Sequence, residues 1–185
     1  PVIHAFSELV MKFYESFQTA KRERAIVDFS DLEHSALKLL ISQDAEDGEL
    51  VPGEIAIELS QKYKEIMIDE YQDTNEIQDA ILYLLNNGHD FFAVGDVKQS
   101  IYRFRLAEPG IFMEKYNSYP CKEGCMRVDL SKNFRSRREI LSAINFVFAQ
   151  MMISQSMEID YDADAALYPG FDYPECEQRL SPEAE

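Results

Sequence analysis

The sequence contains no run of about eighteen apolar residues and no charged-then-apolar segment at its N-terminus, so we expect neither a membrane span nor export. Cysteine is scarce. Cys121, Cys125 and Cys176 are too few for a disulfide framework, and an odd number without an export signal indicates a reducing, cytoplasmic setting. The Cys121 to Cys125 spacing matches half of a zinc site, but no second Cys/His pair accompanies it. We therefore expect structural or incidental thiols.

Positive charge is also scarce, because the net charge is −16 at pH 7. Nucleic-acid-binding proteins usually carry a basic footprint, so this total argues against one. The distribution changes that conclusion, since residues 98–138 hold ten of the 18 Lys and Arg residues and only four acidic ones. The acidic runs at 44–58 and 158–185 are expected to be solvated faces and tails. Hydrophobic residues make up 46% of the 185 positions, which is ordinary for one globular domain or pieces of two.

Helical periodicity dominates the N-terminal part of the chain. The first expected helix is amphipathic, ends near residues 21–24, and has as its apolar residues Phe6, Leu9, Val10, Phe13 and Phe17. A second helix is expected to begin at a capping box of Ser30 and Glu33. Its expected buried stripe is Leu32, Ala36, Leu39 and Leu40. An acidic loop separates it from a short helix expected over 54–63.

Strands alternate with helices in the rest of the chain. Short apolar runs predict strands at 66–68, 91–94 and 126–130, with helices over 75–86 and 107–116. This alternation is typical of a parallel sheet, so we predict an α/β fold with all three strand ends along one edge. A last helix is expected to begin at a capping box of Ser136 and Glu139. Its expected apolar face is Ile140, Ile144, Val147, Phe148 and Met151. From Ser154 on, the composition predicts extended or poorly ordered chain with its own docking contacts.

Two carboxylates follow the first predicted strand directly. In open α/β sheets, ligands bind at the carboxyl ends of the strands. There Asp69 can hold a Mg²⁺ ion on the phosphates of a nucleotide, while Glu70, kept off the metal, can orient and deprotonate an attacking water. Taken alone, the pair is equally well explained as surface acids.

The ends of the other two predicted strands carry polar residues as well. Gln99 has a neutral amide with both donor and acceptor, which suits contact with a γ-phosphate or the attacking water. Arg135 is expected one residue before a helix N-cap, where an arginine can neutralise charge on a transferring phosphate. Phe134 beside it offers a flat ring that can stack an adenine.

Aromatic residues alternate with arginines just after Gln99, at Tyr102, Arg103, Phe104 and Arg105. This composition is typical of a track for single-stranded nucleic acid, in which bases stack on rings and guanidinium groups meet phosphates. Core packing is the alternative explanation for the two rings.

Three long stretches resemble motifs II, III and IV of superfamily 1 DNA helicases of the UvrD/Rep/RecB kind, in that order. They are DEYQDTN at 69–75, VGDVKQSIYRFRLA at 94–107 and LSKNFRSR at 130–137. VDFSDL at 27–32 resembles a short element that precedes motif II. The sequence RFRLA at 103–107 and the segment 157–167 are most similar to those of the AddA (RexA) type of helicase–nuclease. Single-chain helicases usually have Trp where Phe104 stands and Gly where Arg103 stands, and this chain contains no Trp.

The resemblance implies ATP and Mg²⁺ as cofactors and assigns roles to individual residues. It places Asp69 on the metal, makes Glu70 the catalytic base, and lets Gln99 couple the γ-phosphate to the DNA track. Phe134 would stack the adenine and Arg135 would reach the γ-phosphate. Single-stranded DNA would contact Tyr102, Arg103, Phe104 and Arg105. Asp73 and Asp96 would support the site through hydrogen bonds.

The same resemblance implies ATP-driven translocation and unwinding of single- and double-stranded DNA in double-strand-break repair and recombination. A protein of the AddB (RexB) type is the implied partner. One element is missing, because no G-x-x-x-x-G-K-[ST] sequence occurs. Without that phosphate cradle, this polypeptide alone is expected to bind ATP poorly and hydrolyse essentially none.

The expected fold class is therefore a partial RecA-like P-loop NTPase sheet with a helical N-terminal segment, an excised middle piece of a longer protein. Residues 1–62 would end a helical 1B-type insertion, 63–130 would form the returning half of the first RecA-like domain, and 131–185 would begin the second. An open sheet edge would favour self-association.

Two alternatives stay open. One is a stand-alone UvrD-like helicase without nuclease, and the other is a non-catalytic module that binds DNA or protein. The absent phosphate loop favours the module. The set of Asp69, Glu70, Gln99 and Arg135 argues against it, because a scaffold has no chemical need for these residue types at strand ends.

Overall fold

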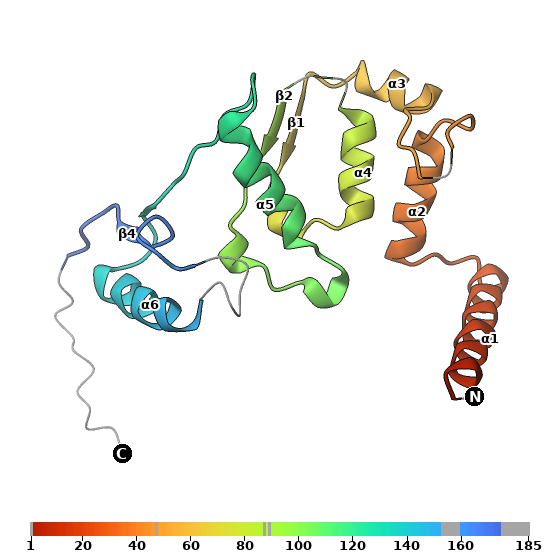
Figure 1. Ribbon diagram of the computed structural model, residues 1–185, viewed down its shortest axis with the longest axis horizontal. Coiled ribbons are helices and arrows are strands. Elements are labelled where there is room, and N and C mark those ends of the chain that lie inside the picture. The colour runs from red at the N-terminus through yellow and green to blue at the C-terminus, as the bar shows by residue number, and fades with distance from the viewer. Residues whose placement is uncertain (1, 47, 87, 89, 153–159, 175–185) are drawn as a thin grey trace. The chain divides into compact units, whose positions relative to one another are not determined.

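The structure is a computed structural model that describes residues 2–46, 48–86, 88, 90–152 and 160–174 (Figure 1). The chain divides into two compact units, residues 1–125 and 126–185. In the part of the chain that the structure describes, no helix is both long enough and apolar enough to cross a bilayer.

The first unit opens with two helices joined by a tight turn. α1 spans Val2–Glu23, as the periodicity predicted, and its apolar residues from Val2 to Phe17 are exposed. α2 spans Phe29–Leu40, and its N-cap is Asp28. The expected capping box of Ser30 and Glu33 is wrong. Asp28 and Asp31 form the box instead, since the carboxylate of Asp28 reaches the N–H of Asp31 at 2.9 Å and begins the helix two residues earlier.

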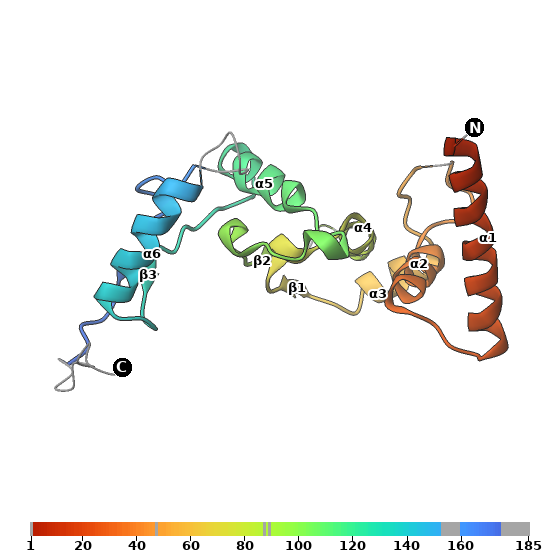
Figure 2. The same ribbon diagram turned by 90° about the horizontal axis from the view of Figure 1, so that it is seen from below.

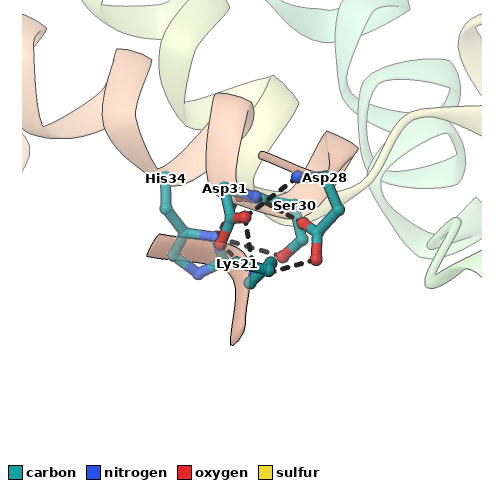
Figure 3. A network of polar contacts seen from close by, with 5 residues as sticks. All are labelled: Lys21, Asp28, Ser30, Asp31 and His34. Atoms are coloured by element: carbon teal, nitrogen blue, oxygen red, sulfur yellow. Dashed lines mark hydrogen bonds and ion pairs between the residues drawn. The ribbon is translucent and has the colours of Figure 1, made fainter. Parts of the chain in front are cut away.

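Lys21 ties the end of α1 to the start of α2 (Figure 3). It is only 7% exposed, and its Nζ donates to Asp31 Oδ2 at 2.6 Å and to Asp28 Oδ2 at 3.0 Å. Its charge also lies 4.7 Å from the centre of the Phe17 ring. Burying an ammonium group is favourable only when its charge is paired, so the two aspartates have both a capping and a neutralising role.

Acid is expected to release this junction. The pKa of Asp28 is lowered mainly by the Asp31 N–H, and that of Asp31 mainly by the Lys21 ammonium. A carboxylate with a lowered folded pKa contributes stability above its unfolded pKa of about 3.9, and this contribution is lost as the pH falls through the folded value. Titration of the carboxyl carbons by NMR should therefore give both aspartates midpoints below that of an ordinary aspartate.

Lys21→Met should move the Asp31 midpoint back up, whereas Lys38→Met, on the exposed side of α2, should leave it in place. An Asp31 midpoint that does not change in Lys21→Met would show that the ammonium group does not hold the junction.

A small core joins α2 to α3 (Glu54–Ser60) and α4 (Glu76–Leu85), which lie side by side in Figures 1 and 2. Its centre is Leu40, Ala56 and Leu84, which are 6%, 0% and 2% exposed. The predicted stripe on α2 is wrong in part, because Leu32 and Leu39 are 53% and 62% exposed. The residues packed around the centre are Leu37, Ile41, Leu59, Ile81 and Leu85.

A contact of Glu33 accompanies this difference between the predicted and the observed buried face of α2. Its carboxylate accepts hydrogen bonds from the amides of Asn75 at 3.1 Å and Gln78 at 2.7 Å. Asn75 is the N-cap of α4, and it forms a capping box with Gln78. The side chain expected to cap its own helix therefore connects α2 to the beginning of α4.

Two of the predicted strands pair in parallel. β1 spans Glu65–Ile68 and β2 spans Asp90–Ala93, with Ile66 opposite Phe91 and Ile68 opposite Ala93. The pairing continues through the Val94 N–H, which donates to the Ile68 carbonyl at 2.9 Å. Apolar runs of this kind indicate buried strands, but one face of this pair is open, because Met67 and Phe92 are 68% and 58% exposed.

Short helical turns and one longer helix follow these strands. The 3₁₀ turns span Tyr71–Asp73, Val97–Gln99, Arg103–Arg105 and Tyr119–Cys121. α5 spans Pro109–Ser118 and begins at the N-cap Glu108, close to the predicted helix over 107–116. It packs against the turn at Tyr71–Asp73, directly after β1.

The second unit does not contain the predicted third strand. Residues 126–130 are not part of a strand, and Met126, Val128 and Leu130 are 80%, 64% and 82% exposed. β3 is only Lys132–Asn133, and it pairs in parallel with β4, Tyr168–Pro169, in a sheet of its own. The expectation that three strand ends share one edge is therefore wrong. An alternating apolar pattern forms a strand only where a neighbour supplies hydrogen-bond partners.

α6 spans Arg138–Met151, and its N-cap Arg137 makes no side-chain cap. The expected capping box of Ser136 and Glu139 is wrong, because the Ser136 N–H donates to Asn133 Oδ1 at 2.8 Å instead. The predicted apolar face is wrong in part: Ile144 and Phe148 are half-buried as expected, but the fully buried residue is Leu141, at 1% exposure. The members of the predicted face that are exposed are Ile140, Val147 and Met151.

Residues 160–174 pack along α6, as expected for a docking tail. Asn145 accepts from the Tyr161 hydroxyl at 2.7 Å and from the Leu167 N–H at 3.0 Å, and it donates to the Leu167 carbonyl at 2.9 Å. The other parts of the predicted tail, 153–159 and 175–185 with Cys176, lie outside the described residues. A polar residue in the middle of α6 therefore fixes the position of this segment.

Candidate nucleotide site and nucleic-acid track

Asp69 and Glu70 emerge from the carboxyl end of β1 at a sharp turn. Glu70 has φ 52°, a left-handed conformation that is uncommon for residues other than glycine. Its N–H donates to Asp69 Oδ1 at 2.9 Å, and both carboxylates are exposed. Strained backbone of this kind concentrates at functional sites. The prediction that these acids lie at a strand end is confirmed.

Gln72 connects the two strand ends. It is 1% exposed, and both ends of its amide are occupied: Nε2 donates to Glu70 Oε2 at 2.7 Å, and Oε1 accepts from the Asp96 N–H at 2.9 Å. Gly95 leaves room for this contact, since a Cβ on Gly95 would lie 2.5 Å from Gln72 Oε1. The carboxyl ends of β1 and β2 are therefore joined by one buried side chain.

Asp96 extends the connection to Gln99. Gln99 Nε2 donates to Asp96 Oδ2 at 3.0 Å, and Lys98 Nζ lies 2.8 Å from Asp96 Oδ1. Burial raises the pKa of Asp96, but the hydrogen bonds from Gln99 and Lys98 outweigh it and leave the pKa below its usual range. Asp96 is consequently a carboxylate at neutral pH. The structure thus brings two predicted site residues, Glu70 and Gln99, into one network.

Asp73 does not make the supporting contacts that were expected of it. Its Oδ1 is buried and has no hydrogen-bond partner in the structure. Burial, followed by the nearby charge of Glu70, raises its pKa. A buried acceptor without a partner is costly, so Asp73 is a strained polar residue of this turn.

The donors at the end of β1 fit a magnesium ion that is held mainly by a nucleotide. Among the described residues, no cluster of three or more His, Cys, Asp or Glu side chains could hold a metal ion. Mg²⁺ commonly takes one or two carboxylates and completes its shell with water and substrate phosphates. Asp69 offers an exposed carboxylate of this kind.

Tyr71 anchors the turn that carries these groups, a role that the sequence did not reveal. It is 1% exposed, and its hydroxyl donates to Asp79 on α4. Lys115 of α5 also contacts Asp79 at 3.1 Å and lies 5.1 Å from the centre of the Tyr71 ring. Burial raises the pKa of Tyr71 well above its usual range, so the hydroxyl stays a donor. The Tyr71 to Asp79 spacing, from a strand end to the first turns of a helix, is the only signal that could have indicated it.

The predicted nucleic-acid track is an exposed 3₁₀ turn. Phe104 is 76% exposed, and its ring centre lies 5.9 Å from that of Tyr102. The Arg105 guanidinium lies 5.0 Å from the Tyr102 ring and 5.6 Å from the Phe104 ring. Arg103 is exposed on the same turn. Core packing therefore does not account for Phe104 within the described residues.

Phe134 and Arg135 belong to the second unit. Phe134 is 65% exposed, and an edge of its ring lies against Gly170, where an added Cβ would come within 2.6 Å of the ring. The carbonyl of Phe134 accepts from the Tyr173 hydroxyl at 2.7 Å. Arg135 is exposed, and because Arg137 is the N-cap it lies two residues before the cap rather than one. The roles of Phe134 and Arg135 stay predictions.

The sequence as a whole has known relatives. A profile of the UvrD/REP helicase N-terminal domain matches residues 4–120. A protein of Geobacillus kaustophilus, named as an ATP-dependent helicase/nuclease subunit, is 50% identical over 183 residues, which covers 96% of this chain and 15% of that protein. The proteins of the same name from Bacillus cereus (strain AH820) and Bacillus anthracis are 49% identical over the same length. The chain therefore spans about 15% of the length of these relatives. Since the domain profile covers more than half of its residues, the chain belongs to the UvrD/REP helicase N-terminal domain family.

Proposed function

We propose that this chain is part of an ATP-dependent DNA helicase, the helicase-bearing polypeptide of a helicase/nuclease, which couples ATP hydrolysis to translocation along single-stranded DNA. The observation that carries the proposal is the hydrogen-bonded connection from Glu70 through Gln72 and Asp96 to Gln99. The exposed track at 102–105 begins three residues after Gln99 in the same unit. Gln99 and this track lie on successive 3₁₀ turns, Val97–Gln99 and Arg103–Arg105, and this closeness supports the proposal.

The chemistry assigned to the site is phosphoryl transfer to water. Glu70 would orient the attacking water and take its proton. Asp69 would hold a magnesium ion, which would supply neutralisation of charge on the phosphates. Gln99 contacts the γ-phosphate or the attacking water. Phe134 and Arg135 would stack the adenine and stabilise charge on the γ-phosphate, as the helicase motifs imply.

The remaining parts of the motor are proposed to lie elsewhere in a longer polypeptide. β1 and β2 would be two strands of a larger RecA-like sheet, which agrees with the exposure of Met67 and Phe92. The division at 62/63 and 130/131 into a 1B-type insertion and two RecA-like domains stays a prediction. So do the phosphate-holding loop, the nuclease, the AddB-type partner, a cytoplasmic location and a role in double-strand-break repair.

The proposal is tested through the track. In the full-length protein, Phe104→Ala should weaken binding of single-stranded DNA by about 1–3 kcal/mol, because each base stacked on an aromatic ring contributes about that much. Fluorescence anisotropy with an oligothymidine probe measures this affinity, and ATP hydrolysis is followed with and without the probe.

Phe146→Ala serves as the matched control, since Phe146 is 70% exposed on α6, outside the track. We expect DNA to stimulate ATP hydrolysis by the unmodified protein. We also expect Phe104→Ala, but not Phe146→Ala, to lose affinity for single-stranded DNA. A full-length protein that hydrolyses ATP at the same rate with and without DNA would refute the proposed coupling.

A further inference from the structure

The amide of Gln72 links the strand-end acids to the turn that carries Gln99. It is buried, and its two polar ends bind different segments: the Glu70 carboxylate on one side and the backbone of Asp96 on the other. A glutamine amide is the residue type for this position, because it offers a donor and an acceptor on one rigid group. None of the proposed helicase roles uses Gln72.

We infer that Gln72 is a positioning residue that makes Glu70 and the Asp96–Gln99 turn move as one body, so that loss of the γ-phosphate at Gln99 also displaces the catalytic base. The inference rests on the proposed function and deepens it. Gln72 is assigned no contact with nucleotide or DNA, and it acts only through Glu70 and Asp96.

The connection is continuous from the catalytic base to the turn. From Glu70 to Gln99 the hydrogen bonds measure 2.7, 2.9 and 3.0 Å, in sequence through Gln72 and Asp96. The Gln72 carbonyl also accepts from the Ser100 hydroxyl at 3.5 Å, which adds a second contact to the same turn. Removing the amide would leave the N–H of Asp96 without its acceptor, an arrangement that proteins avoid.

Gly95 provides an independent way to disturb the same amide. A methyl group there would lie 2.5 Å from Gln72 Oε1 and 3.1 Å from the Tyr71 nitrogen, so Gln72 must leave its place. Gly95→Ala should therefore reproduce the effect of Gln72→Met, although the two changes lie on different strand ends. A merely local packing defect at Gln72 would not predict this agreement.

The test uses the full-length protein with two variants, Gln72→Met and Gly95→Ala. Gln72→Met keeps the length of the side chain but has no amide. The turnover number for ATP should fall about 10- to 100-fold in both variants, because misplacing a catalytic group costs rate, while KM for ATP stays within about threefold. The second measurement is the affinity for single-stranded DNA, once in the presence of a non-hydrolysable ATP analogue and once in the presence of ADP. The ratio of these two affinities should approach one in both variants, because the nucleotide would no longer act on the DNA track.

Two matched controls separate positioning from folding. Gln78→Met removes a half-buried capping amide that bonds Glu33 between α2 and α4. The methyl group of Gly110→Ala approaches only the Glu108 side chain, at 3.0 Å. Both should keep the turnover number and the affinity ratio of the unmodified protein. A variant that loses its affinity for single-stranded DNA both with the ATP analogue and with ADP has a folding defect. If Gln72→Met has such a defect, Gly95→Ala decides: a normal turnover number and a normal affinity ratio in Gly95→Ala would overturn the inference.

The outcomes also distinguish the inference from the function beneath it. If the unmodified protein hydrolyses ATP and its DNA affinity responds to nucleotide, but Gln72→Met and Gly95→Ala keep both properties, Gln72 is not a positioning residue and the helicase proposal stands. If the unmodified full-length protein shows neither hydrolysis nor a nucleotide response, the proposed function fails and the inference fails with it.

Discussion

Replacing Glu70 with glutamine is expected to lower the turnover number for ATP by about 10²- to 10⁴-fold, the usual contribution of a general base. The substitution removes the proton acceptor but preserves the shape of the side chain. The hydrogen bond from Gln72 also survives, because the carbonyl oxygen of a glutamine at this position can accept from Gln72 Nε2 as the carboxylate does at 2.7 Å. The loss should therefore appear in turnover and leave the strand-end turn in place.

The control for this prediction is Glu65→Gln, the same substitution at the opposite end of β1. Glu65 is exposed and pairs with Asp90 in the register of the sheet, far along the strand from the turn at Glu70. Single-turnover hydrolysis and nucleotide binding by the full-length protein are measured for both variants. Turnover by Glu70→Gln within about threefold of the unmodified protein would remove Glu70 from the role of base.

The parts of the fold that could be predicted from sequence are those that local pattern determines. The apolar run at 66–68 and its counterpart at 91–93 form parallel strands, and the helical periodicity around α1 and α4 is matched by real helices. The turn after β1 could be predicted too, since Asp69 and Glu70 follow the strand without a spacer. Local sequence was sufficient because neighbouring residues alone fix these features.

Capping and the direction of helix faces were predicted less well. Ser30 and Glu33 have the spacing of a capping box, but Asp28 and Asp31 have it too, and the buried charge of Lys21 favours the aspartates. Glu33 then binds α4. Such a choice depends on residues from other helices, which no window of local sequence contains.

Tertiary partners also decide the third strand and the role of Gln72. Met126, Val128 and Leu130 alternate as a strand does, yet they are exposed and unpaired in β-structure within the described residues. Gln72 is an unremarkable polar residue in sequence, and its contacts depend on the close approach of Gly95, which follows the neighbouring strand β2. The side chain that connects Glu70 to the turn of Gln99 could therefore not be predicted from the sequence.

Leu84→Ala is expected to lower the free energy of unfolding of the 185-residue chain by about 2–5 kcal/mol, the cost of deleting a buried leucine side chain and leaving a cavity. Leu84 is 2% exposed at the centre of the core that joins α2, α3 and α4. Little other buried apolar surface is available to compensate, because the buried apolar residues in the described part of the chain are only Leu40, Ala56, Tyr71, Leu84, Ala107 and Leu141.

Leu39→Ala is the matched control, and it also tests the corrected face of α2. Sequence periodicity placed Leu39 in the buried stripe, but the structure leaves it 62% exposed, so its truncation should change stability by only about 0.5 kcal/mol or less. Urea unfolding followed by circular dichroism measures both changes on the same chain. Equal losses for the two variants would mean that α2 packs through the predicted stripe after all. A loss confined to Leu84→Ala would establish that the α2–α3–α4 core holds α4 in place. α4 carries Asp79, the hydrogen-bond partner of Tyr71 in the turn that follows Asp69 and Glu70.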